Sequence, residues 1–472
     1  MHRASTGNVS AGNVTGRGPE APELLPLARQ VAGAAKPGEQ VEAYVARSRS
    51  TEVKVFGGEV ESVSSATIDG VGVRVVTDGR QGYAWAGSLE PDIVAETLEE
   101  ARDNAGFGSP DEHHGLASPA DAALPPDRPV TELDLWREAL AGVPAEDKVV
   151  LALALERAVL AGDPRIRGVR VASYGDGAAE SAVANSLGVE SSARRTVCSC
   201  AVLALAGEGT ATRTGYGWSV GREPADLDVD EAATMAVERT VRLLGATQPR
   251  SRRLPVVFDP LVSASVIGLL AAACNGEAVL KGRSMFVGRQ GEEVAAPGVT
   301  LLDDPTTPSA YGASAYDSEG IPTRPVPLIS AGRLGGFLHN VYTGRRSGSG
   351  TTGSAVRGAY KSTPSVGARA LRLEPGPSSP EELMARAEGG LYVQSVSGVG
   401  TGASPVSGDF SVGAEGLMIT GGALGEPVRE LTVASTLQRM LGELVIGSDL
   451  TWLPGSAAGV TLLIPEMTLS GS

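Results

Sequence analysis

Histidine is the commonest metal ligand in proteins, and this chain of 472 residues contains only four. They are His2, the adjacent pair His113 and His114, and His339. A helical zinc site places two ligands one turn apart, as in His-Glu-x-x-His, so that both imidazoles project from one face. No two of the four histidines have this spacing, so we expect no metal site of this kind in the chain.

Two carboxylates in one short segment are the next candidates for chemistry. Asp317 and Glu319 lie in the run from Asp317 to Arg324, and such a pair is suited to acid–base work or to binding a cation. The alternative is a tight turn whose carboxylates accept backbone N–H bonds, as polar turn residues usually do, and we favour it. Asp317, Glu319, Gly320 and Arg324 remain candidates for lining a cavity shared with a substrate or a partner.

A glycine-rich segment near the C-terminus contains a candidate nucleophile, Ser411, beside Asp409 and Phe410. A nucleophilic serine needs a base within hydrogen-bond reach. The only histidine in this half is His339, in a segment with strand-like alternation (337–341) where a lone histidine is usually structural. The sequence therefore does not favour a Ser–His hydrolase, and Asp409, Phe410 and Ser411 are kept as candidates for the same shared cavity.

Composition and charge exclude several classes of function. Hydrophobic residues make up 42% of the chain and charged residues 20%, which is ordinary for a globular protein. A net charge of −15 argues against binding nucleic acid through its phosphates.

The three cysteines are too few for a disulfide framework, and Cys198 and Cys200 suit burial on one face of a strand. With no apolar run of membrane-spanning length and no secretory leader pattern, we expect a cytoplasmic protein without a membrane partner.

Strands and helices are predicted to come in separate blocks in the first half of the chain. The dipeptides Gly57-Gly58 and Asp78-Gly79 are turn signals between runs of alternating valines. The nearly continuous apolar stretch 149–160 predicts a deeply buried helix. In order, we predict a disordered tail at 1–21, strands at 41–45, 53–55 and 60–63, a hairpin at 71–85, a helix from N-cap Ser88 to Gly106, a Pro-rich linker at about 107–131 with exposed His113 and His114, a helix after Pro144, strands at 169–206 and a helix at 230–244.

The second half is predicted to be mostly β. A boundary at 247–253 precedes a short strand at 255–258 and an apolar helix at 260–273. Short strands punctuated by glycine then dominate, apart from a mobile loop at 343–353 and a helical pattern at 433–441. We therefore predict an α+β protein, with an N-terminal mixed α and β domain at 22–246 and a mainly β C-terminal domain at 254–472.

Several motifs of the chain, taken in order, resemble those of one known family, the TldD/TldE (PmbA) family, once described as modulators of DNA gyrase. Each motif is weak alone, and their order and spacing carry the resemblance, which covers nearly the whole chain from about Val41. The motifs are Gly70–Val75, Asn275–Ser284, Asp303–Pro305, Asp317–Arg324, Gly332–Leu334, Gly408–Gly416 and Pro427–Thr432.

The resemblance implies an accessory role rather than a catalytic one. The TldD side of the family carries a His–Glu–His zinc motif on a helix, and the matching segment here, 262–275, has no His, Asp or Glu. The chain therefore resembles the TldE/PmbA side, with no catalytic or metal-ligating residue of its own. The implied function is a heterodimer with a TldD-like metallopeptidase, which supplies the zinc, the activated water and a general-base glutamate, acting on flexible peptides such as leader segments.

Two alternatives remain open from the sequence. The first is a regulatory interaction protein of the gyrase-modulator kind, without a role in proteolysis. The second keeps the peptidase pair and assigns it to the maturation of a peptide-derived natural product. Neither the substrate nor the specific partner follows from the residues.

Overall fold

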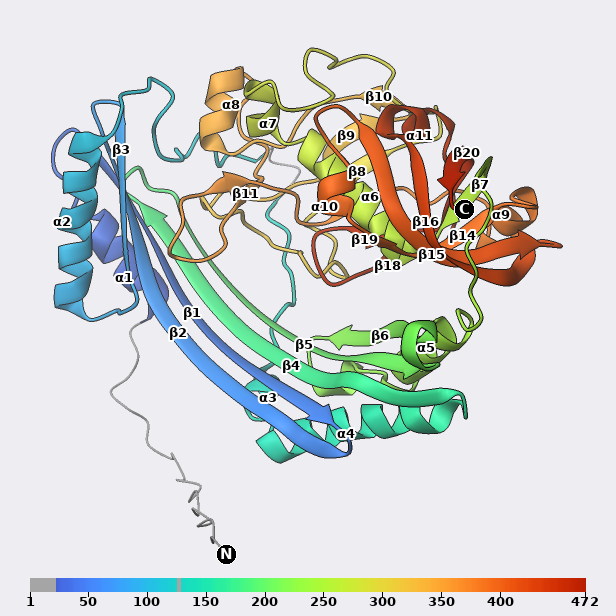
Figure 1. Ribbon diagram of the computed structural model, residues 1–472. Coiled ribbons are helices and arrows are strands. Elements are labelled where there is room, and N and C mark those ends of the chain that lie inside the picture. Colours follow the sequence, from blue (N-terminus) through green and yellow to red (C-terminus); the bar gives the residue numbers. More distant parts are fainter. Residues whose placement is uncertain (1–22, 125–128) are drawn as a thin grey trace, which may run out of the picture.

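The computed structural model describes residues 23–124 and 129–472, so the predicted tail at 1–21 lies outside the described residues. A long curved sheet with helices forms the N-terminal half, and a more compact, strand-rich region forms the C-terminal half (Figure 1). This arrangement confirms the predicted α+β class. The two halves meet at more than one place: Tyr83 on the N-terminal sheet bonds Tyr360, and Arg239, which belongs to a helix at the other end of that sheet, pairs with Asp259.

The N-terminal sheet is antiparallel, with the strand order β3-β2-β1-β4-β5-β6. The alternating valines specify it, because every second side chain points to the same face. Val41, Val73 and Val75 are fully buried on that face. The two turn dipeptides occupy the predicted hairpin turns, and Gly57 and Gly58 both have positive φ. The strands are β1 (Glu39–Phe56), β2 (Glu59–Thr77), β3 (Arg80–Ala86), β4 (Ile166–Asn185), β5 (Glu190–Ala206) and β6 (Arg213–Gly221).

Helices cover this sheet in two groups with separate cores. One group packs on β1 and β2 at one end of the sheet, and the other packs on β4 and β5 towards the other end (Figure 1). Cys198 and Cys200 are buried in the second core, as predicted. The first group is α1 (Leu24–Ala32) and α2 (Pro91–Phe107); the second is α4 (Ala145–Gly162) and α5 (Val229–Val241), with the short α3 (Glu138–Ala141), η1 (Gly209–Ala211) and η2 (Pro224–Asp226) nearby.

Helix bounds and burial differ from the sequence predictions at two places. The N-cap of α2 is Glu90, because Pro91 occupies the first helical position and Ser88 instead accepts a bond from the Glu90 N–H. The prediction that the apolar helix α4 is deeply buried was wrong: Val150 is 57% exposed, whereas Glu156 is buried. The helix lies on one face of the sheet, so its outer side remains open even though its residues are apolar.

The C-terminal sheet closes on itself. Its strands follow the order β16-β15-β14-β7-β20-β17, and β20 also pairs with β16. Helix α6 packs against this sheet in the largest hydrophobic core. The strands are β7 (Arg252–Phe258), β8 (Leu301–Asp303), β9 (Val326–Ser330), β10 (Arg333–Leu334), β11 (Ala355–Val356), β12 (Ser365–Val366), β13 (Leu371–Leu373), β14 (Leu391–Ser397), β15 (Asp409–Thr420), β16 (Ala423–Thr436), β17 (Val445–Ile446), β18 (Thr451–Trp452), β19 (Ala458–Gly459) and β20 (Leu462–Ser470). The helices are α6 (Pro260–Ala273), α7 (Gly276–Leu280), α8 (Val341–Ser347), α9 (Pro380–Arg386), α10 (Val399–Gly402) and α11 (Leu437–Glu443).

Three local predictions for this half were wrong. The helical pattern at 433–441 begins inside β16, and the helix α11 starts only at Leu437. The strand-like alternation around His339 forms no strand, because this segment instead leads into α8, with Asn340 as its N-cap. The predicted loop at 343–353 begins within the same helix. None of the helices in residues 23–124 and 129–472 is long and apolar enough to cross a membrane.

Candidate functional site at the joint between the two halves

The C-terminal half docks on the N-terminal sheet through Tyr360. The backbone carbonyl of Tyr360 accepts a hydrogen bond from the Tyr83 hydroxyl on β3, which also lies 3.0 Å from the carbonyl of Ser362. The motif glycines Gly70 and Gly72 on β2 make this docking possible. A Cβ at Gly70 would overlap the ring of Tyr360, and one at Gly72 would overlap the Tyr360 carbonyl.

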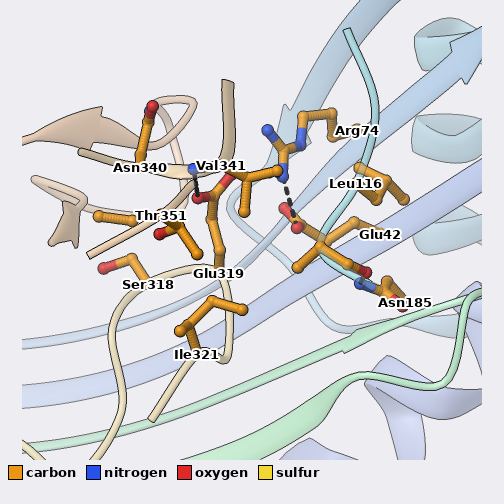
Figure 2. A network of polar contacts seen from close by, with 12 residues as sticks. Glu42, Arg74, Leu116, Asn185, Ser318, Glu319, Ile321, Asn340, Val341 and Thr351 are labelled. Atoms are coloured by element: carbon orange, nitrogen blue, oxygen red, sulfur yellow. Dashed lines mark hydrogen bonds and ion pairs between the residues drawn. The ribbon is translucent and has the colours of Figure 1, made fainter. Parts of the chain in front are cut away.

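A buried network of charges lies beside this contact. Arg74 on β2 donates one hydrogen bond of 2.6 Å to Glu42 on β1 (Figure 2). It donates another, of 3.2 Å, to Glu319 in the C-terminal half. Arg357 pairs with the second oxygen of Glu42. Glu42 and Glu319 are completely buried, so the two guanidinium groups supply the charge that such carboxylates require.

Asp317 and Glu319 form the predicted turn. One oxygen of Asp317 accepts the N–H groups of Glu319 (2.8 Å) and Ile321 (3.0 Å), and the other accepts that of Ala355 (3.0 Å). Glu319 accepts a hydrogen bond of 2.9 Å from the N–H of Val341, the first residue of α8 (Figure 2). Burial and the neighbouring Glu319 raise the pKa of Asp317. These carboxylates therefore serve the backbone and the joint.

Gly320 completes the turn in the left-handed region, with φ of +82°. A side chain there would also press on Val189 and Val183, at the turn between β4 and β5. The turn at 317–321 is therefore fitted closely to the N-terminal sheet, which explains the position of the glycine within the motif.

A cavity of about 490 Å³ opens between the sheet and these loops. Strands β1, β4 and β5 form one wall, and the segments around Asp317 and Tyr360 form the other. A second cavity of about 460 Å³ shares several lining residues with the first, among them Arg194, Arg195 and Ser314, and extends it along β5 towards Leu135. The two cavities together make a groove at the joint.

The candidate residues predicted from the sequence do not all reach this groove. Asp317 lines it, and Glu319 and Gly320 support the turn behind it. Arg324 instead lines a separate cavity of about 670 Å³ and donates a 2.5 Å hydrogen bond to the carbonyl of Thr351.

The three late candidates lie at the start of β15, outside the groove linings. Phe410 is buried against Phe258 in the C-terminal core. Asp409 and Ser411 alternate with Phe410 and are exposed, and Asp409 accepts a hydrogen bond from Ser407. The alternation of buried and exposed side chains along one strand accounts for the positions of all three residues.

Arginines of the groove were missed by the sequence reasoning. Arg195, Arg357 and Arg369 line the larger cavity. They are scattered over 175 positions of the chain, and no spacing rule marks them. The one local signal in the sequence was the adjacent pair Arg194 and Arg195 within a predicted strand.

His339 and His114 have structural surroundings. His339 is buried against Gly276, and its Nδ1 lies 3.2 Å from the Thr343 hydroxyl; burial lowers the pKa of its imidazole. His113 and His114 are half-buried rather than exposed. The Nδ1 of His114 lies 2.9 Å from the Gly79 carbonyl, and its ring packs against Tyr342. The described part of the predicted linker therefore packs against both halves.

Comparison with known proteins assigns the chain to a family. Three models of PmbA/TldA metallopeptidase domains match it in order: domain 1 at residues 41–105, the central domain at 138–244 and the C-terminal domain at 251–471. The chain belongs to the PmbA/TldD metallopeptidase family. The curved sheet thus combines strands from the first two family domains, and the groove lies where the third meets them.

Individual members of the PmbA/TldD family match nearly end to end. The metalloprotease PmbA of Escherichia coli O157:H7 is 28% identical over 91% of this chain and 92% of its own length. A Bacteroides thetaiotaomicron structure, described as a proposed modulator of DNA gyrase, is 26% identical with a TM-score of 0.84, covering 95% of this chain and 98% of that one. TldE from Thermococcus kodakarensis shares the fold at 23% identity and a TM-score of 0.84, covering 94% and 99%.

The metal implied by the family description does not fit the residues of this chain. Helix α6 directs Val262, Val266 and Leu270 into the core, and its buried Ser263 is occupied by bonds with Pro260 and Val460. Asp259, before the helix, is paired with Arg239. Across the residues that the structure describes, no three His, Cys, Asp or Glu side chains are grouped so that they could hold a metal ion.

Proposed function

We propose that this chain is the non-metal-binding, TldE/PmbA-like subunit of a heterodimeric metallopeptidase that cleaves flexible peptides or leader segments. A TldD-like partner carries the zinc, and this chain completes the substrate chamber. The observation that supports the proposal most directly is the composition of α6: its buried side chains are mainly aliphatic, pack into the core and offer no zinc ligand. The family membership supports the peptidase context.

The groove along β5 supports a role in holding an extended peptide. Strand β6 pairs with β5 only from Cys198 onward, so the described chain leaves the preceding edge of β5 without a neighbouring strand. The N–H of Thr196 points to this side, because it donates to the Leu135 carbonyl. Backbone groups of alternate residues point the same way, so those of Ser192 and Arg194 face the groove. A peptide could add to this edge as a further strand.

The outer edge of the β1–β2 hairpin is a suitable surface for the partner subunit. Strand β3 covers β2 only from Val71 onward, and elsewhere in the described residues no strand pairs with the outer side of β2. Phe56, Val60, Val63 and Ile68 are 45–58% exposed there. An open edge with apolar side chains tends to associate with another chain, and the proposed occupant is the metal-bearing partner of the same family.

Peptidase activity on an unstructured peptide tests the proposal. The assay compares this chain alone, a TldD-like partner alone and the two together, each with and without chelator, and the zinc content of each chain is measured. We expect chelator-sensitive cleavage only from the mixture, with zinc on the partner. Stoichiometric zinc on this chain with peptide cleavage by it alone would contradict the proposal, as would a partner whose activity does not change when this chain is added.

A further inference from the structure

Two arginines of the groove stand out because carboxylates do not pair with them. Arg195 on β5 and Arg369 in the C-terminal half both line the larger cavity, one on each wall. In residues 23–124 and 129–472 neither makes an ion pair with an Asp or Glu side chain within 4.0 Å. Burial, together with the positive charge of Arg369, lowers the pKa of Arg195.

The contacts of the two guanidinium groups leave donors free. Arg195 donates to the carbonyl of Ala313. Arg369 donates to the Ser318 hydroxyl at 3.1 Å and to the Ala355 carbonyl at 2.8 Å, while its Nε is buried without a partner. A guanidinium carries five N–H donors, so most of them are unused in each case.

The acids nearest to Arg369 are committed elsewhere. Asp317 accepts three backbone N–H groups, and Asp303 accepts the N–H groups of Arg369 and Ala370 through one oxygen. Burial raises the pKa of both carboxyls, and their charge in turn acts to raise the pKa of Arg369. In the described residues, however, neither carboxylate accepts a hydrogen bond from the guanidinium group of Arg195 or Arg369, so those N–H donors stay available.

The other charges of the cavity do not change this balance. Arg357 is paired with Glu42, and Arg47 lies 2.9 Å from Asp69. Arg194 lies over the ring of Trp136. Glu180 is the remaining acid in the lining, and it sits opposite Arg194 in the β4–β5 register. The cavity thus carries surplus positive charge inside a chain whose net charge is −15.

We propose that Arg195 and Arg369 form a binding subsite for a carboxylate group of the peptide held in the groove. This inference rests on the proposed function, since it names a chemical feature of that substrate. Arginine suits the task because its planar fork binds carboxylates through two parallel hydrogen bonds. The carboxylate comes either from an Asp or Glu side chain or from a free C-terminus, and a flexible peptide offers both.

An unpaired guanidinium in a partly closed cavity is unfavourable for stability alone. Burying a charge without a partner costs free energy, and a second like charge in the lining of the same cavity adds to the cost. A bound carboxylate removes both costs. Exposed side chains of the same type, such as Arg49 on β1, carry no such penalty and give a matched control.

Calorimetric titration of the full chain with three unlabelled peptides tests the subsite. All three have a blocked N-terminus and share one unstructured sequence of neutral residues, apart from a single internal position that is either Glu or Gln. The first has one internal Glu and an amidated C-terminus, the second has Gln in place of Glu and a free C-terminus, and the third has Gln and an amidated C-terminus. We expect one or both acidic peptides to bind at least about tenfold more tightly than the neutral one. The acidic peptide whose affinity exceeds that of the neutral one identifies the source of the carboxylate.

Variants then assign the effect to the two side chains. Arg195→Gln and Arg369→Gln are expected to abolish the preference for the acidic peptide, while Arg49→Gln retains it. Arg195→Lys keeps the charge but loses the fork, so we expect an intermediate preference. Thermal unfolding of each variant checks the fold. If Arg369→Gln does not fold, the two Arg195 variants carry the test.

The outcomes separate this inference from the proposed function. Equal affinity for all three peptides, no binding of any of them at millimolar concentration, or a preference unchanged in Arg195→Gln would each overturn the subsite. Any of these results leaves cleavage by the two-chain mixture untouched. Conversely, a carboxylate preference that depends on Arg195, together with a mixture that cleaves nothing, would support the subsite and remove the peptidase role.

Discussion

Arg74 on β2 donates a hydrogen bond of 3.2 Å to Glu319, which lies 245 residues further along the chain, and both side chains are buried. This contact joins the N-terminal sheet to the turn that carries Asp317. The Glu42 carboxylate extends it to Arg357 on the other side of the joint. The wall of the groove therefore depends on charges from both halves.

Replacing Arg74 should destabilise the joint strongly. Arg74→Met leaves Glu319 buried with only the Val341 N–H as a partner and removes one of the two guanidinium groups from Glu42. Breaking a buried ion pair from one side costs about 3–5 kcal/mol. Chemical denaturation checks this value. The exposed Arg49→Met is the control, with an expected change within about 0.5 kcal/mol. Equal effects of both variants would contradict a role for the network in stability.

Adding one methyl group at Gly70 should disturb the docking of the C-terminal half. Its Cβ would overlap the ring of Tyr360, and overpacking of this kind costs about 1–3 kcal/mol. A second replacement, Tyr360→Ala, removes the overlapping ring, so the effect of Gly70→Ala should become much smaller in that background. A double-mutant cycle measured by thermal unfolding gives this coupling. Gly168→Ala, on β4 with no atom within 4 Å of the new Cβ, is the matched control.

The stability of the chain should depend on the protonation of Asp303. Burial raises the pKa of this carboxyl from 3.8 to about 6, so the folded state binds a proton more tightly than the unfolded state does. The contribution of Asp303 to stability is then full below pH 4 and is lost as the pH rises towards 6. Asp303→Asn keeps an oxygen for the Arg369 and Ala370 N–H groups but cannot ionise.

The free energy of unfolding of Asp303→Asn, measured against that of the natural chain, checks this pH dependence. The variant should gain about 2 kcal/mol relative to the natural chain between pH 4 and pH 6.5, out of about 3 kcal/mol over the whole titration. A difference that stays constant over this range would show that the carboxyl titrates normally. Asp78→Asn, in the exposed hairpin turn, is the control substitution.

A charge on the open edge of β2 should weaken assembly with the metal-bearing partner. Val63 is 50% exposed, so Val63→Asp is tolerated by the folded chain but places a carboxylate in the proposed interface. We expect at least about a tenfold loss of affinity in a titration followed by light scattering. Val150→Asp, on the exposed face of α4, should have no effect. Unchanged affinity of Val63→Asp would place the interface elsewhere.

Local signals in the sequence predicted the parts of the fold that depend on neighbours in the chain. The turns at Gly57-Gly58 and Asp78-Gly79 and the alternating valines around Val73 define the first strands and their register. The bounds of α6 follow in the same way, because Pro260 and the N-cap Asp259 fix where the helix starts. These features need no knowledge of the distant chain.

The candidate site could not be predicted in the same way. Asp317 was identified because a turn motif is local, but its groove is built from strands more than a hundred residues earlier. Arg195 and Arg369 come together only when both halves are folded. His339 was misplaced on a strand because its neighbours alternate in polarity, whereas in the structure Leu338, His339, Asn340 and Val341 are all buried as the chain enters α8.

The order of strands in the sheet has a consequence for synthesis of the protein. Strand β1 lies between β2 and β4, and Ala43 pairs with Ala184 on β4, so one side of β1 must wait for about 140 more residues to leave the ribosome. At 5–20 residues per second this takes roughly 7–30 seconds. During that time β1 is an edge strand, and it carries the charged residues Glu42, Arg47 and Glu52. These charges discourage pairing with other nascent chains until β4 arrives.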